Sequence, residues 1–188
     1  MKALTFLITL FLSSSIAVAQ TDSLSAVLYS LIQNKEPFIE KKERDISEIK
    51  KMLEVPDLSK RQQYDINRKL FEEYKTYISD SAIHYAQNNL KIAYELNDSY
   101  AISETKLILA SAYSIAGMFI ESLDLLKSIE KRNLTYELKV SYYDNYKLLY
   151  GYYAQNNFYT SGYNKRSAIY RDSLLGLLDT NFTHYKIV

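Results

Sequence analysis

Hydrophobic residues recur with the period of an α-helix along nearly the whole chain after residue 20. The first stripe has the spacing i, i+3, i+4 and i+7 and is formed by Leu24, Val27, Leu28 and Leu31. Breaks rich in Pro, Asp, Asn and Ser separate the periodic segments, and these residues favour turns and helix caps. The pattern predicts helices joined by short links, so that consecutive helices lie antiparallel as neighbours.

The breaks give approximate helix boundaries. Pro37 suits the first turn of a helix that carries charges of both signs on its outer side, which is typical of a solvated face. After the break at residues 55–57, Asp57 or Ser59 can cap the next helix, and a further helix follows residues 79–81. The last four helices are predicted near residues 101–116, 119–130, 136–155 and 158–178.

Composition supports an all-α fold. Hydrophobic residues make up 47% and charged residues 24% of the 188 residues, which is typical of a folded domain. With only 4 Gly and 2 Pro, long helices are favoured over architectures with many turns. The formal net charge of +1 indicates no polyanionic partner, so we expect no nucleic-acid binding. The absence of cysteine excludes disulfides, cysteine-ligated zinc and a thiol nucleophile.

The N-terminus has the pattern of a secretory signal peptide. Lys2 is followed by an apolar stretch at residues 3–12, and Ala17-Val18-Ala19 is a suitable cleavage site. An uncleaved membrane anchor is the alternative, which Ser13-Ser14-Ser15 disfavours. We therefore expect export to the periplasm, with no membrane contact after cleavage unless the chain continues to a spanning helix.

The segment LASAYSIAGMFIESLDLL, residues 109–126, reads as a tight helical hairpin. Small Ala110 and Ser122 suit a close helix crossing, and Gly117 tolerates the left-handed conformation of a sharp helix end. Large residues would fill the groove between this hairpin and its neighbours. The residues expected to hold the hairpin together are Leu109, Ala110, Tyr113, Gly117, Phe119, Ser122, Leu126 and Ile129.

This spacing resembles the tetratricopeptide repeat over residues 103–133. The family pattern is Leu and a small residue, then Tyr, Gly, an aromatic, Ala, a large apolar residue and Ala. Here Ser122 and Ile129 replace the two alanines, and Lys106 stands where an aromatic is usual. The resemblance implies antiparallel hairpins stacked as an array, preceded by two N-terminal helices; an ordinary helical bundle is the alternative.

A wider resemblance covers most of the chain, and LFEEYKTYISDSAIHYA, residues 70–86, is its most specific part. The chain is similar to the N-terminal part of exported tetratricopeptide proteins of Bacteroidetes-type bacteria, which share a domain of unknown function. We expect a signal peptide at residues 1–19, a helical segment at 20–56 and a tetratricopeptide-like domain at 57–188. The resemblance also implies an alternative role, as the sensory ectodomain of a membrane-bound transcription regulator.

Candidate chemistry is sparse. His84 and His184 are the only histidines, and we expect His84 to be a hydrogen-bonded structural residue on a packed helix. The sequence has no histidine or carboxylate pattern for a metal, no glycine-rich phosphate loop and no patterned catalytic triad. We therefore predict no catalytic residues, no cofactor and no enzyme activity.

The 19 tyrosines favour an interaction surface. Those at residues 142–170 fall on several helix faces, so one face cannot bury them all. Tyrosine is enriched at protein interfaces, which favours a partner surface. The alternative is that these tyrosines pack between the helices and leave only their rims exposed. The predicted function is a non-catalytic helical-repeat module that binds a protein or peptide outside the cytoplasm. Its candidate partner surface consists of Tyr142, Tyr152, Tyr159 and Tyr163.

Overall fold

The computed structural model describes residues 24–157 and 161–178. The predicted signal peptide, Tyr159 and His184 lie outside these residues. All regular secondary structure in the described part is helical. After a helix at residues 24–33, the elements are α2 (Glu36–Met52), α3 (Lys60–Tyr74), α4 (Ser79–Glu95), α5 (Ser99–Ile115), α6 (Phe119–Lys127), the 3-10 helix η1 (Lys131–Asn133), α7 (Tyr136–Asn156) and α8 (Ser161–Leu177).

The chain divides into two compact units, residues 1–47 and 48–188. In the first unit, the apolar stripe of helix 24–33 is exposed, with exposed fractions between 55% for Val27 and 66% for Leu24. The second unit contains the last residues of α2 and all helices from α3 to α8. None of the described helices combines the length and the hydrophobicity that a membrane crossing requires.

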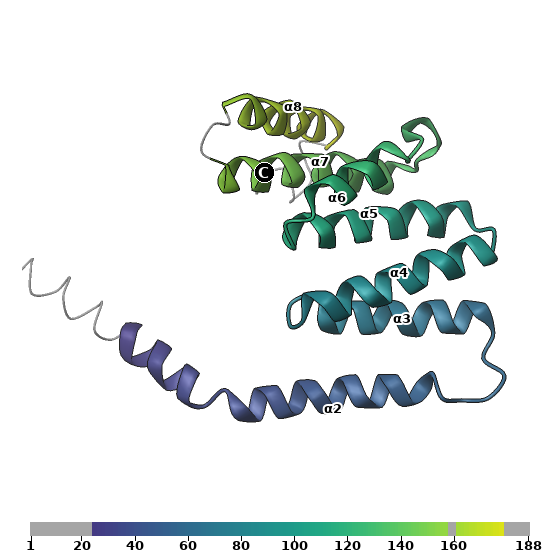
Figure 1. Cartoon of the computed structure of the whole chain (residues 1–188), viewed down its shortest axis with the longest axis vertical. Coiled ribbons are helices and arrows are strands. Elements are labelled where there is room, and N and C mark those ends of the chain that lie inside the picture. Colours follow the sequence, from purple (N-terminus) through teal and green to yellow (C-terminus); the bar gives the residue numbers. More distant parts are fainter. Residues whose placement is uncertain (1–23, 158–160, 179–188) are drawn as a thin grey trace, which may run out of the picture. The chain divides into compact units, whose positions relative to one another are not determined.

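The second unit is a stack of three antiparallel helical hairpins, α3–α4, α5–α6 and α7–α8 (Figure 1). Each helix packs against the next, and α5 also packs against α7. The predicted fold class, an all-α array of stacked tetratricopeptide-like hairpins, is therefore confirmed.

Local sequence signals set the helix ends. Ser59 and Gln62 form a capping box at α3, in which the Gln62 N–H donates to Ser59 Oγ and the Ser59 N–H to Gln62 Oε1. Asp98 caps α5 by accepting the Ala101 N–H at 3.0 Å. Gly117 ends the α5 turn with φ +79°, and the following N–H, of Met118, donates to the Tyr113 carbonyl.

Among the described residues, two clusters of buried side chains belong to the core of the second unit. One joins α3, α4 and α5 and contains Tyr64, Ile92, Ala93 and Ala101. The larger one joins α5, α6 and α7 and contains Leu107, Ala110, Leu126, Ile129, Leu134, Leu138, Tyr146 and Leu149. The sequence predicted α6 to reach residue 130, but it ends at Lys127, because residues 128–135 turn through η1 into α7.

Candidate binding surface

The residues expected to hold the second hairpin gather at the α5–α6 crossing and its turn. Leu109, Ala110, Tyr113, Ser122, Leu126 and Ile129 are all at most 9% exposed. Ser122 Oγ donates to the Ala110 carbonyl at 2.8 Å and lies 2.8 Å from Ser114 Oγ. Phe119 is partly buried and meets the edge of Tyr153 at 5.2 Å between ring centroids. Ser122 thus satisfies its hydroxyl group at a crossing where the repeat pattern has alanine.

The predicted tyrosine surface is distributed over different environments. Tyr142 packs against the larger core cluster and lies edge-on to Tyr146, with ring centroids 5.0 Å apart. Tyr163 lies 4.4 Å from Tyr153, centroid to centroid, and carries the Arg166 guanidinium over its ring. Tyr152 lines a groove between α7 and α8. The three described tyrosines therefore do not share one open face.

Most of the tyrosines of α7 and α8 pack against one another. The rings of Tyr146 and Tyr170 stack with centroids 4.4 Å apart, and Tyr150 stacks on both. Burial raises the pKa of the Tyr146 and Tyr170 hydroxyls above their ordinary values. The α7–α8 hairpin thus packs through stacked aromatic rings, whereas α5 and α6 pack mainly through aliphatic side chains.

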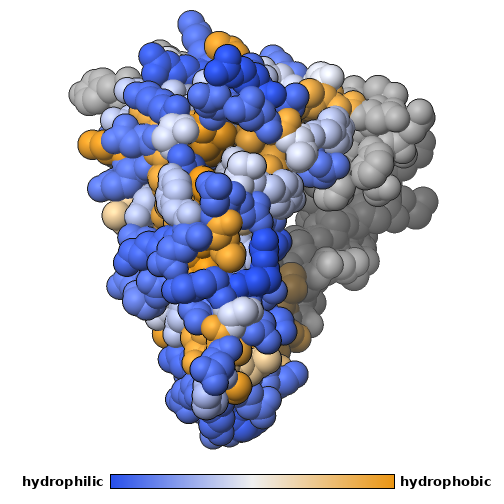
Figure 2. Space-filling model, turned by 90° about the vertical axis from the view of Figure 1, so that its right-hand side faces the viewer, coloured by the Kyte–Doolittle hydropathy of each residue, from blue (hydrophilic) through white to orange (hydrophobic). Residues whose placement is uncertain are grey.

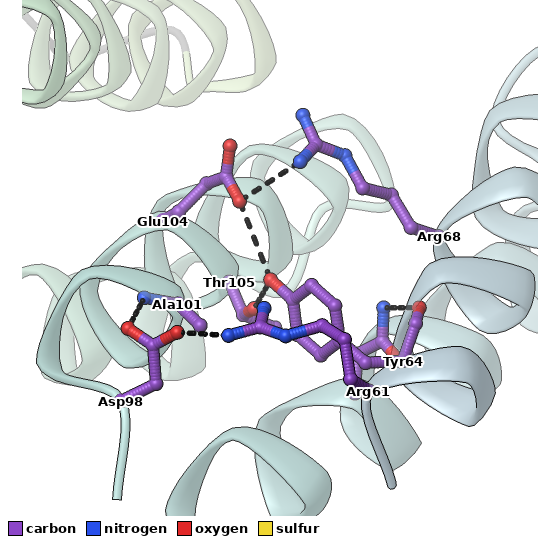
Figure 3. Close-up of polar contacts among 8 residues, drawn as sticks. Arg61, Tyr64, Arg68, Asp98, Ala101, Glu104 and Thr105 are labelled. Atoms are coloured by element: carbon purple, nitrogen blue, oxygen red, sulfur yellow. Dashed lines mark hydrogen bonds and ion pairs between the residues drawn. The ribbon is translucent and has the colours of Figure 1, made fainter. Parts of the chain in front are cut away.

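A polar network joins α3 to α5, and it was not predicted from the sequence (Figure 3). Arg68 and the Tyr64 hydroxyl both donate to Glu104 Oε2, at 3.1 and 3.3 Å. The Tyr64 oxygen also lies 2.8 Å from Thr105 Oγ1, and burial raises the pKa of Tyr64. Because these partners are 36 to 41 residues apart in the chain, periodicity along one helix does not reveal them.

A second link sits at the start of α5. Arg61 on α3 donates to Asp98 Oδ2, so the residue that caps α5 also binds α3 (Figure 3). The Ala101 N–H and the Arg61 guanidinium hold the pKa of the Asp98 carboxyl below its ordinary value. The sequence signal that was available was the Asn97-Asp98-Ser99 turn; the arginine partner was not detectable. These contacts fix the register between the first two hairpins.

Beside this network the stack leaves an open, mainly apolar pocket of about 240 Å³. It lies where the second halves of α3 and α5 meet the start of α4, and Phe71, Ala82, Ala112 and Ile115 supply its apolar surface. Ile115 is 58% exposed although it is a large aliphatic residue. An apolar side chain of a partner could be desolvated here without disturbing the core.

Among the described residues on the side that Figure 2 shows, hydrophobic ones form separate patches between hydrophilic ones. Within the described residues, no group of three or more His, Asp or Glu side chains could hold a metal ion. His84 was expected to be a hydrogen-bonded structural residue on a packed helix. Its ring nitrogen does pair with the Asn88 amide at 3.0 Å, but its side chain is exposed.

Comparison with known proteins identifies the family. A model of the SusR N-terminal TPR domain, in which TPR denotes the tetratricopeptide repeat, matches residues 32–188. Comparison with curated proteins and with solved structures gave no match. Domains of this repeat type generally act as protein-interaction modules. Because the match extends over most of the chain and agrees with the stacked hairpins described above, the chain belongs to the SusR N-terminal TPR domain family.

Proposed function

We propose that this chain is a non-catalytic repeat module that binds a protein or peptide partner outside the cytoplasm, using the pocket between α3 and α5. The observation that carries this proposal is the pocket itself, with the exposed Ile115 at its edge. The network of Arg61, Arg68 and Glu104 would keep the two helices in register while a partner binds. A preformed apolar site on a rigid stack lowers the ordering cost of association.

The test is partner capture by the mature chain, residues 20–188, from a periplasmic extract. Ile115→Arg is expected to abolish capture, because the arginine places a charge at the apolar pocket. Ile169→Arg is the matched control, since Ile169 is 61% exposed on α8 and lies outside the pocket. Equal capture by both variants, or no protein enriched over a tag-only control, would contradict the proposal.

The tyrosine surface is a separate part of this proposal. Tyr142 packs against the core, so its replacement would lower stability and confuse the readout. Tyr152→Ser is the cleaner variant, because Tyr152 lines a groove and has an intermediate exposure. If Tyr152→Ser leaves capture unchanged at an unchanged melting temperature, Tyr152 does not belong to the partner surface.

The location is proposed from the signal-peptide pattern of residues 1–19. Expression in a Gram-negative host should yield a chain whose first residue is Gln20, recovered from the periplasmic fraction. N-terminal sequencing of the purified protein measures this directly. An intact Met1 and recovery with the cytoplasmic fraction would refute export.

A second candidate is the sensory ectodomain of a membrane-bound regulator. It is favoured by the description of the matching family as an N-terminal domain. Sequencing the gene beyond the codon for Val188 tests it. A continuing frame with a long apolar segment would support the ectodomain, whereas an immediate stop codon would leave the free module.

A further inference from the structure

A second surface of the array lies between α7 and α8, away from the α3–α5 pocket. It is a groove of about 390 Å³ whose floor contains Leu148, Gly151 and Ala168. The floor is low because two of these residues are small: a Cβ on Gly151 would meet only Ser167 Oγ, at 3.6 Å. Ser167 Oγ in turn donates to the Lys147 carbonyl at 2.9 Å, which holds the two helices close together.

The same positions in the preceding hairpin are covered by a helix. Counted back from the ends of α5 and α7, Leu107 and Ala110 correspond to Leu148 and Gly151. Counted from the starts of α6 and α8, Leu126 corresponds to Ala168. In the α5–α6 hairpin, Leu107, Ala110 and Leu126 are buried in the cluster that α7 completes. The α7–α8 groove is therefore the next helix-accepting face of the array.

Its chemistry differs from that of the covered face. The groove is lined by the polar side chains of Lys147, Arg171, Gln155 and Asn164, and none of its described lining residues carries a carboxylate. Asp144 and Asp172 pair with Lys147 and Arg171 at 2.7 and 2.9 Å from outside the groove. Arg171 nevertheless keeps 48% of its side chain exposed. A partner helix with carboxylates on the facing side would give these cations a second ionic partner, whereas a purely apolar helix would only remove water from them.

The charge balance along the chain points the same way. Residues 127–178 contain eight Lys and Arg residues and four Asp and Glu residues. Residues 36–126 contain twelve Lys and Arg residues and sixteen Asp and Glu residues. The last hairpin and the linker before it are thus basic within a nearly neutral protein. Complementary charge across an interface selects the partner and speeds association.

We propose that the α7–α8 groove binds a helix of a partner protein that carries carboxylates on the side facing the groove. The helical form follows from continuity with the face that α7 covers, and the acidic character follows from Lys147 and Arg171. The small floor residues let the partner helix approach closely, as Ala110 does for α7. This inference goes beyond the α3–α5 pocket of the proposed function, because it concerns the groove that Tyr152 lines and gives its partner a helical form and a defined charge.

The test uses the full chain and two labelled synthetic helical peptides of about 20 residues, a length at which a helix can form in water. Both carry the same Ala and Leu stripe; one has Glu and the other Lys at the flanking positions. Fluorescence anisotropy should give a dissociation constant about tenfold lower for the Glu peptide, and the difference should shrink at high salt. Equal affinities, or no binding of either peptide, would overturn the proposal.

Charge reversal locates the site. Arg171→Glu should remove the preference for the Glu peptide and turn it toward the Lys peptide, and Lys147→Glu should act in the same direction. Lys91→Glu on α4 is the matched control, since Lys91 is exposed and far from the groove lining in sequence. A preference unchanged by both groove variants, or changed equally by Lys91→Glu, would refute the site. The Ile115→Arg variant should bind the peptides like the unmodified chain, so this test is independent of the α3–α5 pocket.

Discussion

Replacing Ser122 by alanine tests whether the serine holds the helix crossing together or only fits it. Ser122 is fully buried and Ser114 is 2% exposed. The Ser122 hydroxyl donates to the Ala110 carbonyl, and the Ser114 hydroxyl lies within hydrogen-bond distance of Ser122 Oγ, both at 2.8 Å. Ser122→Ala therefore removes two hydrogen bonds and leaves the Ser114 hydroxyl without its partner.

The size of the effect follows from where the Ser114 hydroxyl can turn. A buried hydroxyl left unsatisfied costs about 1–3 kcal/mol. However, Ser114 lies four residues after Ala110 on α5, so its hydroxyl can rotate to the Ala110 carbonyl, as helical serines commonly do. We therefore expect Ser122→Ala to lower the free energy of unfolding by about 1–2 kcal/mol, in the lower part of that range.

A double-mutant cycle separates the pair from its surroundings. Ser114→Ala removes one hydrogen bond and should cost about 0.5–1.5 kcal/mol, since Ser122 can still donate to Ala110. The double variant has neither hydroxyl, so we expect its loss to be smaller than the sum by at least about 0.5 kcal/mol. Urea unfolding followed by far-UV circular dichroism measures all three. Strict additivity, or a stabilising Ser122→Ala, would refute the argument.

Three further predictions follow from single positions. Ala110→Arg should lower stability by about 3 kcal/mol or more and greatly reduce Tm, because it forces a charge into a fully buried crossing; an unchanged Tm would refute the repeat alignment. Gly151→Ala should raise the free energy of unfolding by about 0.5–1 kcal/mol, because the added Cβ makes only an ordinary contact. Gly117→Ala should lower it, because a φ of +79° is strained for alanine. Urea titrations in which both variants change stability in the same direction would contradict this prediction. The pKa of Asp98 is lowered in the folded state, so its ionised carboxylate stabilises the fold at neutral pH, and this stabilisation is lost as the pH falls below about 4. Between about pH 5 and pH 3, Asp98→Asn should therefore lose less stability than the unmodified chain, as measured by urea midpoints.

The order of the helices was predictable because each one carries its own signal. The periodic stripes, the caps at Ser59 and Asp98 and the glycine at residue 117 act within one or two turns of the chain. The close crossing of Ala110 and Ser122 was also predictable, because small residues in both helices permit it. Interactions between residues close in sequence thus determine where the helices lie and where the sharpest turn falls.

The contacts between hairpins were not predictable in the same way. Tyr64, Arg68 and Glu104 meet only after α3 and α5 have been placed side by side, and none has a distinctive neighbour in the sequence. The tyrosines show the same limit: Tyr142 was predicted at the partner surface, whereas its ring packs against Tyr146 and the core. Side-chain partners across helices depend on the register of the stack, which a one-dimensional pattern does not contain.

The departures from the repeat pattern show how such an array tolerates change. At the α5–α6 crossing, alanine is replaced by Ser122, whose added hydroxyl is fully hydrogen-bonded. Where an aromatic is usual, the Lys106 ammonium lies 3.4 Å from the Ser128 carbonyl and 5.9 Å from the Tyr94 ring centroid. In both cases the new polar group finds a partner within the same or the adjoining hairpin, so the stacking geometry is kept. Arg171 on α8 follows the same rule, because its guanidinium pairs with Asp172 at 2.9 Å. The acidic helix proposed above would bring a second carboxylate to this pair, so the charge of the α7–α8 groove would select among partners.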